Sequence, residues 1–96
     1  MYGLIGQIEV VDGRREELAA ILTGSGSMPG CLSYVVANDR DNPNALWVTE
    51  VWESTESHTA SLALPAVQAA IAVGGPLIER FNTRIETEPL GGIGLP

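Results

Sequence analysis

Apolar residues occupy both faces of the first three strands that this sequence predicts, and this feature constrains the fold more than any other. In the first β-rich run, residues 2–11, Leu4 and Ile5 fall on opposite faces and are both apolar. The runs 31–38 and 45–53 are also rich in β-branched and large apolar side chains. A strand that is covered on one side alternates between apolar and polar residues, so we expect this sheet to be covered on both sides.

The order of the predicted elements is strand, helix, strand, strand, helix, strand. The predicted strands are 2–11, 31–38, 45–53 and 82–88, and the predicted helices are 14–23 and a region that begins at Ser54 or Thr55. Asp12 is expected to cap the first helix, and Pro65 to restart the second helical region. Gly74-Gly75-Pro76 should interrupt that region, with Ile78 still on its helical stripe. This is the ferredoxin-like β-α-β-β-α-β pattern, an α+β fold with helices on one face of a four-stranded antiparallel sheet.

The second face of that sheet needs a partner. Residues 1–96 are short enough for a single domain with one modest core, and their helices can cover one face only. A large exposed apolar face marks a partner site, and the simplest partner is a second copy of the chain. We therefore predict a homodimer. The tail 89–96 either adds Leu90, Ile93 and Leu95 to this interface or is a frayed terminus.

The charge of the chain excludes several classes of protein. The sequence has 12 acidic residues, five basic residues that are all arginine, and a net charge of −7. Nucleic acids and anionic membrane surfaces need clustered cations, so neither is expected as a partner. One cysteine and one histidine are too few for an internal disulfide or a dedicated transition-metal site.

No cofactor or targeting segment is expected either. The chain has no phosphate loop, dinucleotide fingerprint or nucleophile elbow, so we predict no metal, haem or flavin in the purified protein. No apolar run approaches the roughly 20 residues of a spanning helix. The N-terminus lacks a basic region followed by an apolar stretch, and a cytoplasmic location is therefore expected.

Three motifs carry a family resemblance. They are Met28-Pro29-Gly30-Cys31-Leu32-Ser33-Tyr34, Asp39-Arg40-Asp41-Asn42-Pro43-Asn44 and Glu50-Val51-Trp52-Glu53-Ser54. In this order and spacing the chain resembles the antibiotic biosynthesis monooxygenase domain family over nearly its whole length. The resemblance implies a dimeric α+β barrel and, in characterised members, oxidation of quinols, anthrones or similar polyphenols by O2 without flavin or metal. Related members degrade haem, and others act on lipids or aldehydes, so the fold carries over better than the function.

The sequence departs from the family at the histidine. Many members have a histidine about nine residues after the tryptophan, where this chain has Ser61. The single histidine, His58, lies three residues earlier and shares a helical face with Ser61. Haem-degrading relatives use an asparagine on strand one, where this chain offers Gln7, and a haem-degrading activity is therefore not expected.

Cofactor-free oxygenation requires a pocket that holds an aromatic ring, takes a proton from it and excludes water. We expect this pocket between the sheet and the second helical region, near Trp52. The predicted catalytic residue is His58, as proton acceptor, although a lone helix histidine is often solvated or capping. The predicted substrate-binding residues are Trp52, Tyr34, Gln7, Ser61 and Phe81. Trp47 is a further possible wall, and Asn38, Arg84 and Glu50 are further polar candidates.

Several of these residues also have structural interpretations. Trp52 is either a core residue or a wall of the pocket. Glu50 either pairs with an arginine or lines a wet cavity, and the pair is favoured because buried charges are usually paired. Arg84 is expected to act as a salt-bridge partner. Cys31 is expected to be a small buried hydrophobe. Two functions therefore remain open: a small cofactor-independent monooxygenase of hydroxylated aromatics, or a non-catalytic dimeric domain that binds a small apolar ligand or serves as an accessory subunit.

Overall fold

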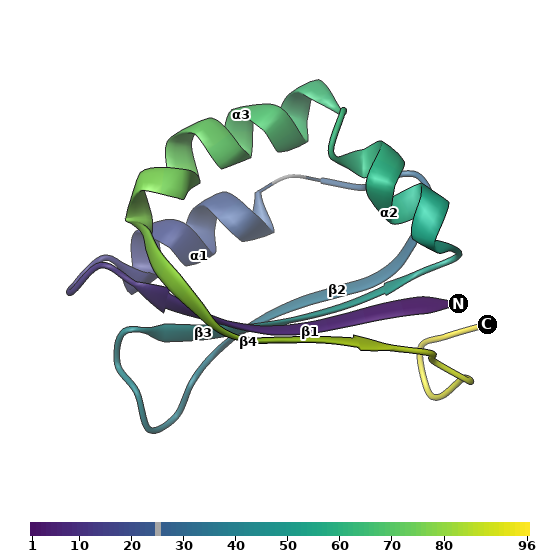
Figure 1. The fold of residues 1–96 in the computed structure, drawn as a ribbon, viewed down its shortest axis with the longest axis horizontal. Helices are drawn as coiled ribbons and strands as arrows, with labels where there is room; N and C mark the ends of the chain where they lie inside the picture. The colour runs from purple at the N-terminus through teal and green to yellow at the C-terminus, as the bar shows by residue number, and fades with distance from the viewer. Residues whose placement is uncertain (25) are drawn as a thin grey trace.

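The computed structural model describes residues 1–24 and 26–96, and it confirms the β-α-β-β-α-β order (Figure 1). The elements are β1 (Tyr2–Val10), α1 (Arg15–Thr23), β2 (Cys31–Asn38), β3 (Ala45–Trp52), α2 (Thr55–Ser61), α3 (Pro65–Gly74), the 3₁₀ helix η1 (Gly75–Leu77) and β4 (Ile78–Thr87). Part of the expected loop 24–30 therefore lies outside the described residues, at position 25.

The four strands form one antiparallel sheet in the order β2-β3-β1-β4. Leu4 lies opposite Glu50 and Ile8 opposite Leu46, so the even-numbered residues of β1 and β3 share one face. All three α-helices lie on one side of the sheet (Figure 1). We call this helix-covered side the inner face, and the other side the outer face.

The core lies between α1 and the inner face. Leu18 of α1 is 1% exposed and packs with side chains from β1, β3 and η1. The buried cluster consists of Ile8, Val10, Leu18, Leu46, Val48 and Leu77. Because this cluster lies toward one end of the sheet, the other end is free to form a site beneath α2 and α3.

The second helical region divides as the sequence predicts. Ser54 caps α2, with its Oγ accepting a hydrogen bond from the backbone N–H of Ser57 at 3.1 Å. Pro65 occupies the first turn of α3, and η1 follows at Gly75. Within residues 1–24 and 26–96 no single helix is long and apolar enough to cross a membrane. Taken together, α2 and the segment Pro65–Leu77 reach that length and composition, but they are bent by 68°.

Two sequence predictions about these elements are wrong. Asp12 does not cap α1, because its Oδ1 accepts a hydrogen bond from the Asn44 side chain at 2.8 Å, and α1 has no side-chain cap. Ile78 is not helical. It is extended, with φ −89° and ψ 117°, and it pairs with Val10, so β4 begins four residues earlier than predicted.

The glycine of the Pro-Gly-Cys motif, Gly30, lies directly before β2 and packs against the first turn of α2. Gly30 has a φ of 80°, which favours glycine, and its carbonyl accepts the backbone N–H of Glu53 at 2.8 Å. A Cβ at this position would lie 2.6 Å from Cβ of Ser57. The first turn of α2 can therefore pack this closely against the start of β2 only with glycine there.

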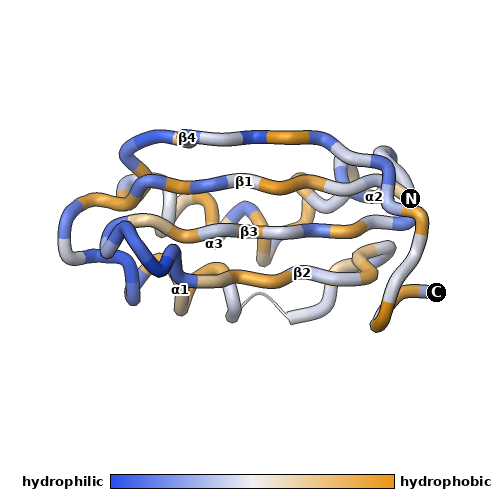
Figure 2. Tube along the Cα trace, turned by 90° about the horizontal axis from the view of Figure 1, so that it is seen from below, coloured by the Kyte–Doolittle hydropathy of each residue, from blue (hydrophilic) through white to orange (hydrophobic). Residues whose placement is uncertain are grey.

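The outer face has no helix over it (Figure 2). Its apolar residues include Val35, which is 53% exposed, and Ile85, which is 50% exposed. In Figure 2 hydrophobic segments recur along the strands, whose side chains point alternately to the two faces.

Candidate functional site

A cavity of about 520 Å³ lies between the inner face and the helices, where the sequence predicts a pocket. Most of its lining is apolar. The lining residues are Leu18, Leu22, Met28, Tyr34, Glu50, Trp52, His58, Ser61, Leu62, Val67, Ala70, Ile71, Gly74, Gly75, Ile78 and Phe81. A volume of this size falls in the range typical of sites for small ligands.

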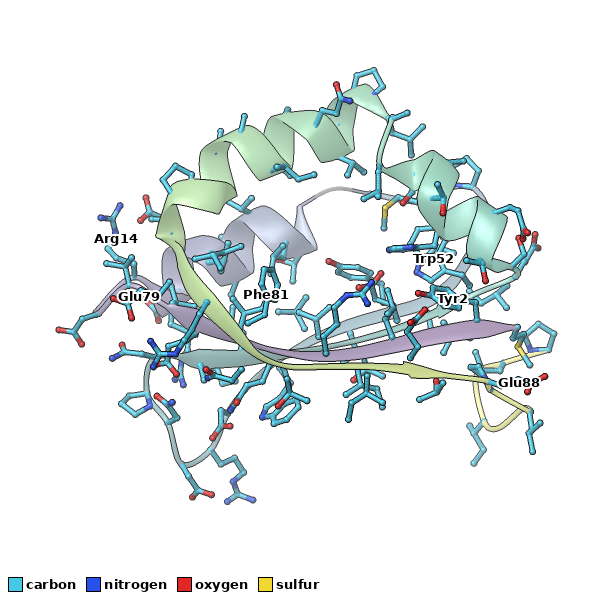
Figure 3. All side chains as sticks on the ribbon, viewed as in Figure 1. Tyr2, Arg14, Trp52, Glu79, Phe81 and Glu88 are labelled. Carbon is cyan, nitrogen blue, oxygen red and sulfur yellow. The ribbon has the colours of Figure 1, made fainter. Side chains whose placement is uncertain are left out.

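An aromatic cluster forms one end of this space. Trp52 closes β3 and is 1% exposed, and the His58 ring of α2 packs against it edge-on, with centroids 5.3 Å apart at 73°. The Tyr2 ring also contacts His58, with centroids 5.5 Å apart. Figure 3 shows Trp52 and Tyr2 together below α2, with Phe81 farther along the sheet toward α1. The indole and the imidazole thus meet at the cavity wall, so Trp52 is at once a core residue and a lining residue.

Glu50 faces the cavity and is bound to Trp52. Its Oε1 accepts a hydrogen bond from Trp52 Nε1 at 2.9 Å. The ion pairs among the described residues are Arg14 with Glu17 and Arg80 with Glu79. The prediction that Glu50 pairs with an arginine is therefore wrong. The donor is instead Trp52, which lies two residues along β3 on the same face.

Tyr34 lies opposite Glu50 on β2 and keeps its proton. Burial, together with the negative charge of Glu50, raises the pKa of Tyr34 to about 12. Burial also raises the pKa of the Cys31 thiol, with a further contribution from Glu50. Tyr34 is therefore a neutral wall with a hydroxyl, and Cys31 is not an activated nucleophile.

Ser61 and Phe81 also line the cavity, each in a different way. Ser61 is 4% exposed, and its Oγ donates to the backbone carbonyl of His58 at 2.6 Å. Its hydroxyl proton is thus already used within α2, although the oxygen can still accept a hydrogen bond. Phe81 of β4 is 60% exposed and lies at the rim.

Gln7 is not in the cavity, and this prediction is wrong. It lies on the outer face, where its Nε2 donates to Asp39 Oδ2 at 2.8 Å. Trp47 is on the same face, and its Nε1 donates to the same oxygen at 2.7 Å. The backbone N–H of Asp41, then the Trp47 indole and the backbone N–H of Asn42, and last the Gln7 amide, lower the pKa of Asp39 to about 2. Gln7 and Trp47 are therefore residues of the outer face and not walls of the pocket.

Arg84 and Asn38 do not line the cavity either. Arg84 belongs to neither of the two ion pairs among the described residues, so its predicted role as a salt-bridge partner is also wrong. The hydroxyl of Tyr2 donates to Glu86 Oε2 at 2.8 Å, and this bond raises the pKa of Tyr2. The Tyr2 ring, held in this way, supports His58 from the side of β1.

The sequence analysis missed Tyr2 and Met28 as residues of the site. The signal was present for Tyr2, because strand alternation places it on the same face as Leu4. Glu50 was among the polar candidates for the pocket, and alternation places it on the same face as Trp52. Met28 had no such signal, because it lies between α1 and β2 and only the packing of the loop brings it to the cavity. The part of the chain that the structure describes brings no three His, Cys, Asp or Glu side chains together in a group that could hold a metal ion.

The fold and the cavity define a class: a small ferredoxin-like α+β domain with an apolar site between its sheet and its helices. A family model described as "Antibiotic biosynthesis monooxygenase" matches residues 1–73. The chain belongs to the antibiotic biosynthesis monooxygenase family, as the motif resemblance predicted. Among proteins with curated functions, none matches the chain.

Solved structures agree with this assignment. A crystal structure described as a "putative Antibiotic biosynthesis monooxygenase" from Chloroflexus aurantiacus J-10-fl is 56% identical, with a TM-score of 0.96 over 99% of this chain and 98% of that chain. A protein with the same description from Deinococcus radiodurans is 24% identical, with a TM-score of 0.75 over 97% and 96% of the two chains. One from Nitrosomonas europaea is 14% identical, with a TM-score of 0.81 over 95% and 100%. At these lower identities the likeness shows the fold alone.

Proposed function

We propose that this protein is a cofactor-independent monooxygenase that oxidises a quinol, an anthrone or a similar hydroxylated aromatic with O2. The observation that carries the proposal is the cavity of about 520 Å³, whose apolar walls enclose one imidazole packed against an indole. Apolar walls suit an aromatic ring, and the imidazole of His58 can act as a proton acceptor. Membership of the family supports the same reaction class.

The chemistry asks the protein for a proton acceptor and a dry site. His58 would take a proton from the substrate, which leaves an electron-rich anion that can reduce O2. In an anthrone, the ring methylene loses two hydrogens and gains one oxygen atom as a carbonyl, and the second oxygen atom leaves as water. Trp52 and the aliphatic side chains of α3 would hold the ring and keep bulk water away from the anion.

Oxygen uptake by metal-free protein against a panel of anthrones and hydroquinones tests the proposal. His58→Phe keeps a ring beside Tyr2 and Trp52 but removes the proton acceptor, so turnover should fall by about 10²–10⁴. Thr59→Ala, an exposed change one residue along α2, is the matched control and should leave the rate unchanged. A loss below about threefold for His58→Phe on a substrate that wild type turns over would remove His58 from catalysis. Ligand binding with no oxygen uptake on the whole panel would favour a non-catalytic binding domain instead.

We further propose that the working form is a homodimer joined through the outer face. Val35 and Ile85 are about half exposed there, and the tail beyond β4 presents Leu90 and Ile93, which are 93% and 108% exposed. Apolar surface of several hundred Å² contributes about 25 cal/mol per Å² when it is hidden, before the cost of association. A second copy, sheet against sheet, would cover this surface in both chains at once.

A further inference from the structure

Glu50 is the one charged side chain among the described residues that line the cavity. The other polar groups there are the His58 imidazole, the Tyr34 and Ser61 hydroxyls and backbone atoms. No arginine lines the cavity in the described part of the chain, and no ion pair involves Glu50. The charged group of this cavity, the Glu50 carboxylate, therefore accepts hydrogen bonds and does not attract anions.

The carboxylate is fixed in place and only half used. Trp52 Nε1 donates to Oε1 at 2.9 Å, and Trp52 itself is 1% exposed, so the donor is held by the core. Across residues 1–24 and 26–96, that bond is the one that the Glu50 side chain makes. Its second oxygen, Oε2, is thus left to accept a bond from whatever occupies the cavity.

We propose that Glu50 selects the ligand: Oε2 accepts a hydrogen bond from the hydroxyl of an uncharged aromatic, and the carboxylate excludes aromatics that carry an acid group. The inference deepens the proposed function in that it takes the same cavity as the ligand site. Hydrogen bonds to a charged acceptor are stronger than those between neutral groups. A second carboxylate in the same site would meet a like charge at short range in surroundings of low polarity.

Three naphthalenes of nearly equal size separate these effects. 2-Naphthol is neutral and donates a hydrogen bond, 2-methoxynaphthalene is neutral and donates none, and 2-naphthoate carries a carboxylate. Equilibrium dialysis at neutral pH should show that wild type binds 2-naphthol about tenfold or more tightly than either of the others. Equal affinity of wild type for 2-naphthol and 2-naphthoate, or no measurable binding of 2-naphthol, would overturn the inference.

Variants of Glu50 test whether this residue is the cause. Glu50→Gln can still accept from Trp52 Nε1 but has no charge, so the preference over 2-naphthoate should fall by about tenfold while the fold is kept. Glu50→Ala should remove the preference for 2-naphthol over 2-methoxynaphthalene. Glu53→Gln removes the same charge from an exposed carboxylate three residues along the chain, and it should change neither ratio.

The selection of ligands by Glu50 and the monooxygenase activity can be tested separately, because equilibrium dialysis measures binding and does not require turnover. Unchanged ratios in both Glu50 variants, with circular dichroism showing a native fold for Glu50→Gln, would refute the role of Glu50 even if the protein consumes oxygen. Ratios that depend on Glu50 in a protein without oxygen uptake would leave this inference standing and remove the monooxygenase.

Discussion

Replacing Trp52 with Phe should destabilise the protein, and most of the loss should depend on Glu50. The change keeps a six-membered ring in a position that is 1% exposed, but it deletes the Nε1–H that reaches Glu50 Oε1. Hydrogen bonds to charged groups contribute about 1.5–3 kcal/mol. Glu50 is half-buried, so we expect a contribution near the lower end of this range, about 1–2 kcal/mol.

The dependence on Glu50 is measured by a double-mutant cycle. Trp52→Phe in wild type should cost about 1–2 kcal/mol more than Trp52→Phe in Glu50→Ala, because the second background has already lost the acceptor. For a domain of this size each kcal/mol lowers Tm by about 4–8 °C. Urea unfolding followed by circular dichroism, at one fixed protein concentration, gives the four free energies of unfolding that the cycle needs.

The matched control makes the same chemical change on the other face of the sheet. Trp47→Phe deletes an indole N–H that donates to Asp39, and its effect should add to that of Glu50→Ala without coupling. A coupling energy between Trp52 and Glu50 below about 0.5 kcal/mol would refute the reasoning. The hydrogen bond between them would then stabilise the protein no more than hydrogen bonds of the same groups to water.

Three further predictions concern the outer face. Val35→Glu should dissociate the dimer in light scattering, whereas Val73→Glu, at a comparably exposed valine of α3, should leave the mass unchanged; a dimeric Val35→Glu would place the interface elsewhere. The pKa of Asp39 is held at about 2, below its usual 3.8, by backbone N–H groups and by Trp47 and Gln7, so its contribution to stability should be complete above about pH 4 and be lost as the pH falls toward 2. Melting curves of wild type and Asp39→Asn should therefore converge over that range, and a constant difference would contradict the assignment. Gln7→Ala should leave the affinity for 2-naphthol unchanged, because Gln7 bonds to Asp39 away from the cavity; a severalfold loss in dialysis would show that it reaches the ligand.

Local sequence signals predicted most of the fold because most of the helix boundaries have a local cause. Ser54 caps α2, Pro65 starts α3, and Gly75 with the following proline ends it in a 3₁₀ turn. The start of β4 was missed because Ile78 continues the apolar spacing of the helix before it. Its pairing with Val10, 68 positions away in the sequence, decides its conformation, and no local pattern reports such a contact.

The site was predictable where alternation and spacing were followed, and not where residue chemistry alone was used. Trp52 and His58 were placed correctly at the cavity from their positions on a strand end and a helix. Gln7 was assigned to the pocket because of its amide group. It lies three residues from Leu4 on β1, so strand alternation places it on the opposite face, away from the helices. Glu50 was assigned an arginine because buried charges are usually paired, but its donor is the neighbouring indole.

Two carboxylates of the outer face, Asp39 and Glu9, are hydrogen-bonded within the chain, and this bears on what the face can do. Asp39 accepts from both Gln7 and Trp47, and Glu9 accepts from the side chains of Asn42 and Asn82. Burying a polar group is costly when it loses its hydrogen bonds to water and gains none. Because these groups keep their partners inside one chain, a second copy can cover the face without leaving them unpaired. The association can therefore draw on the exposed apolar residues of β2 and β4, while the inner face remains free to hold the ligand cavity.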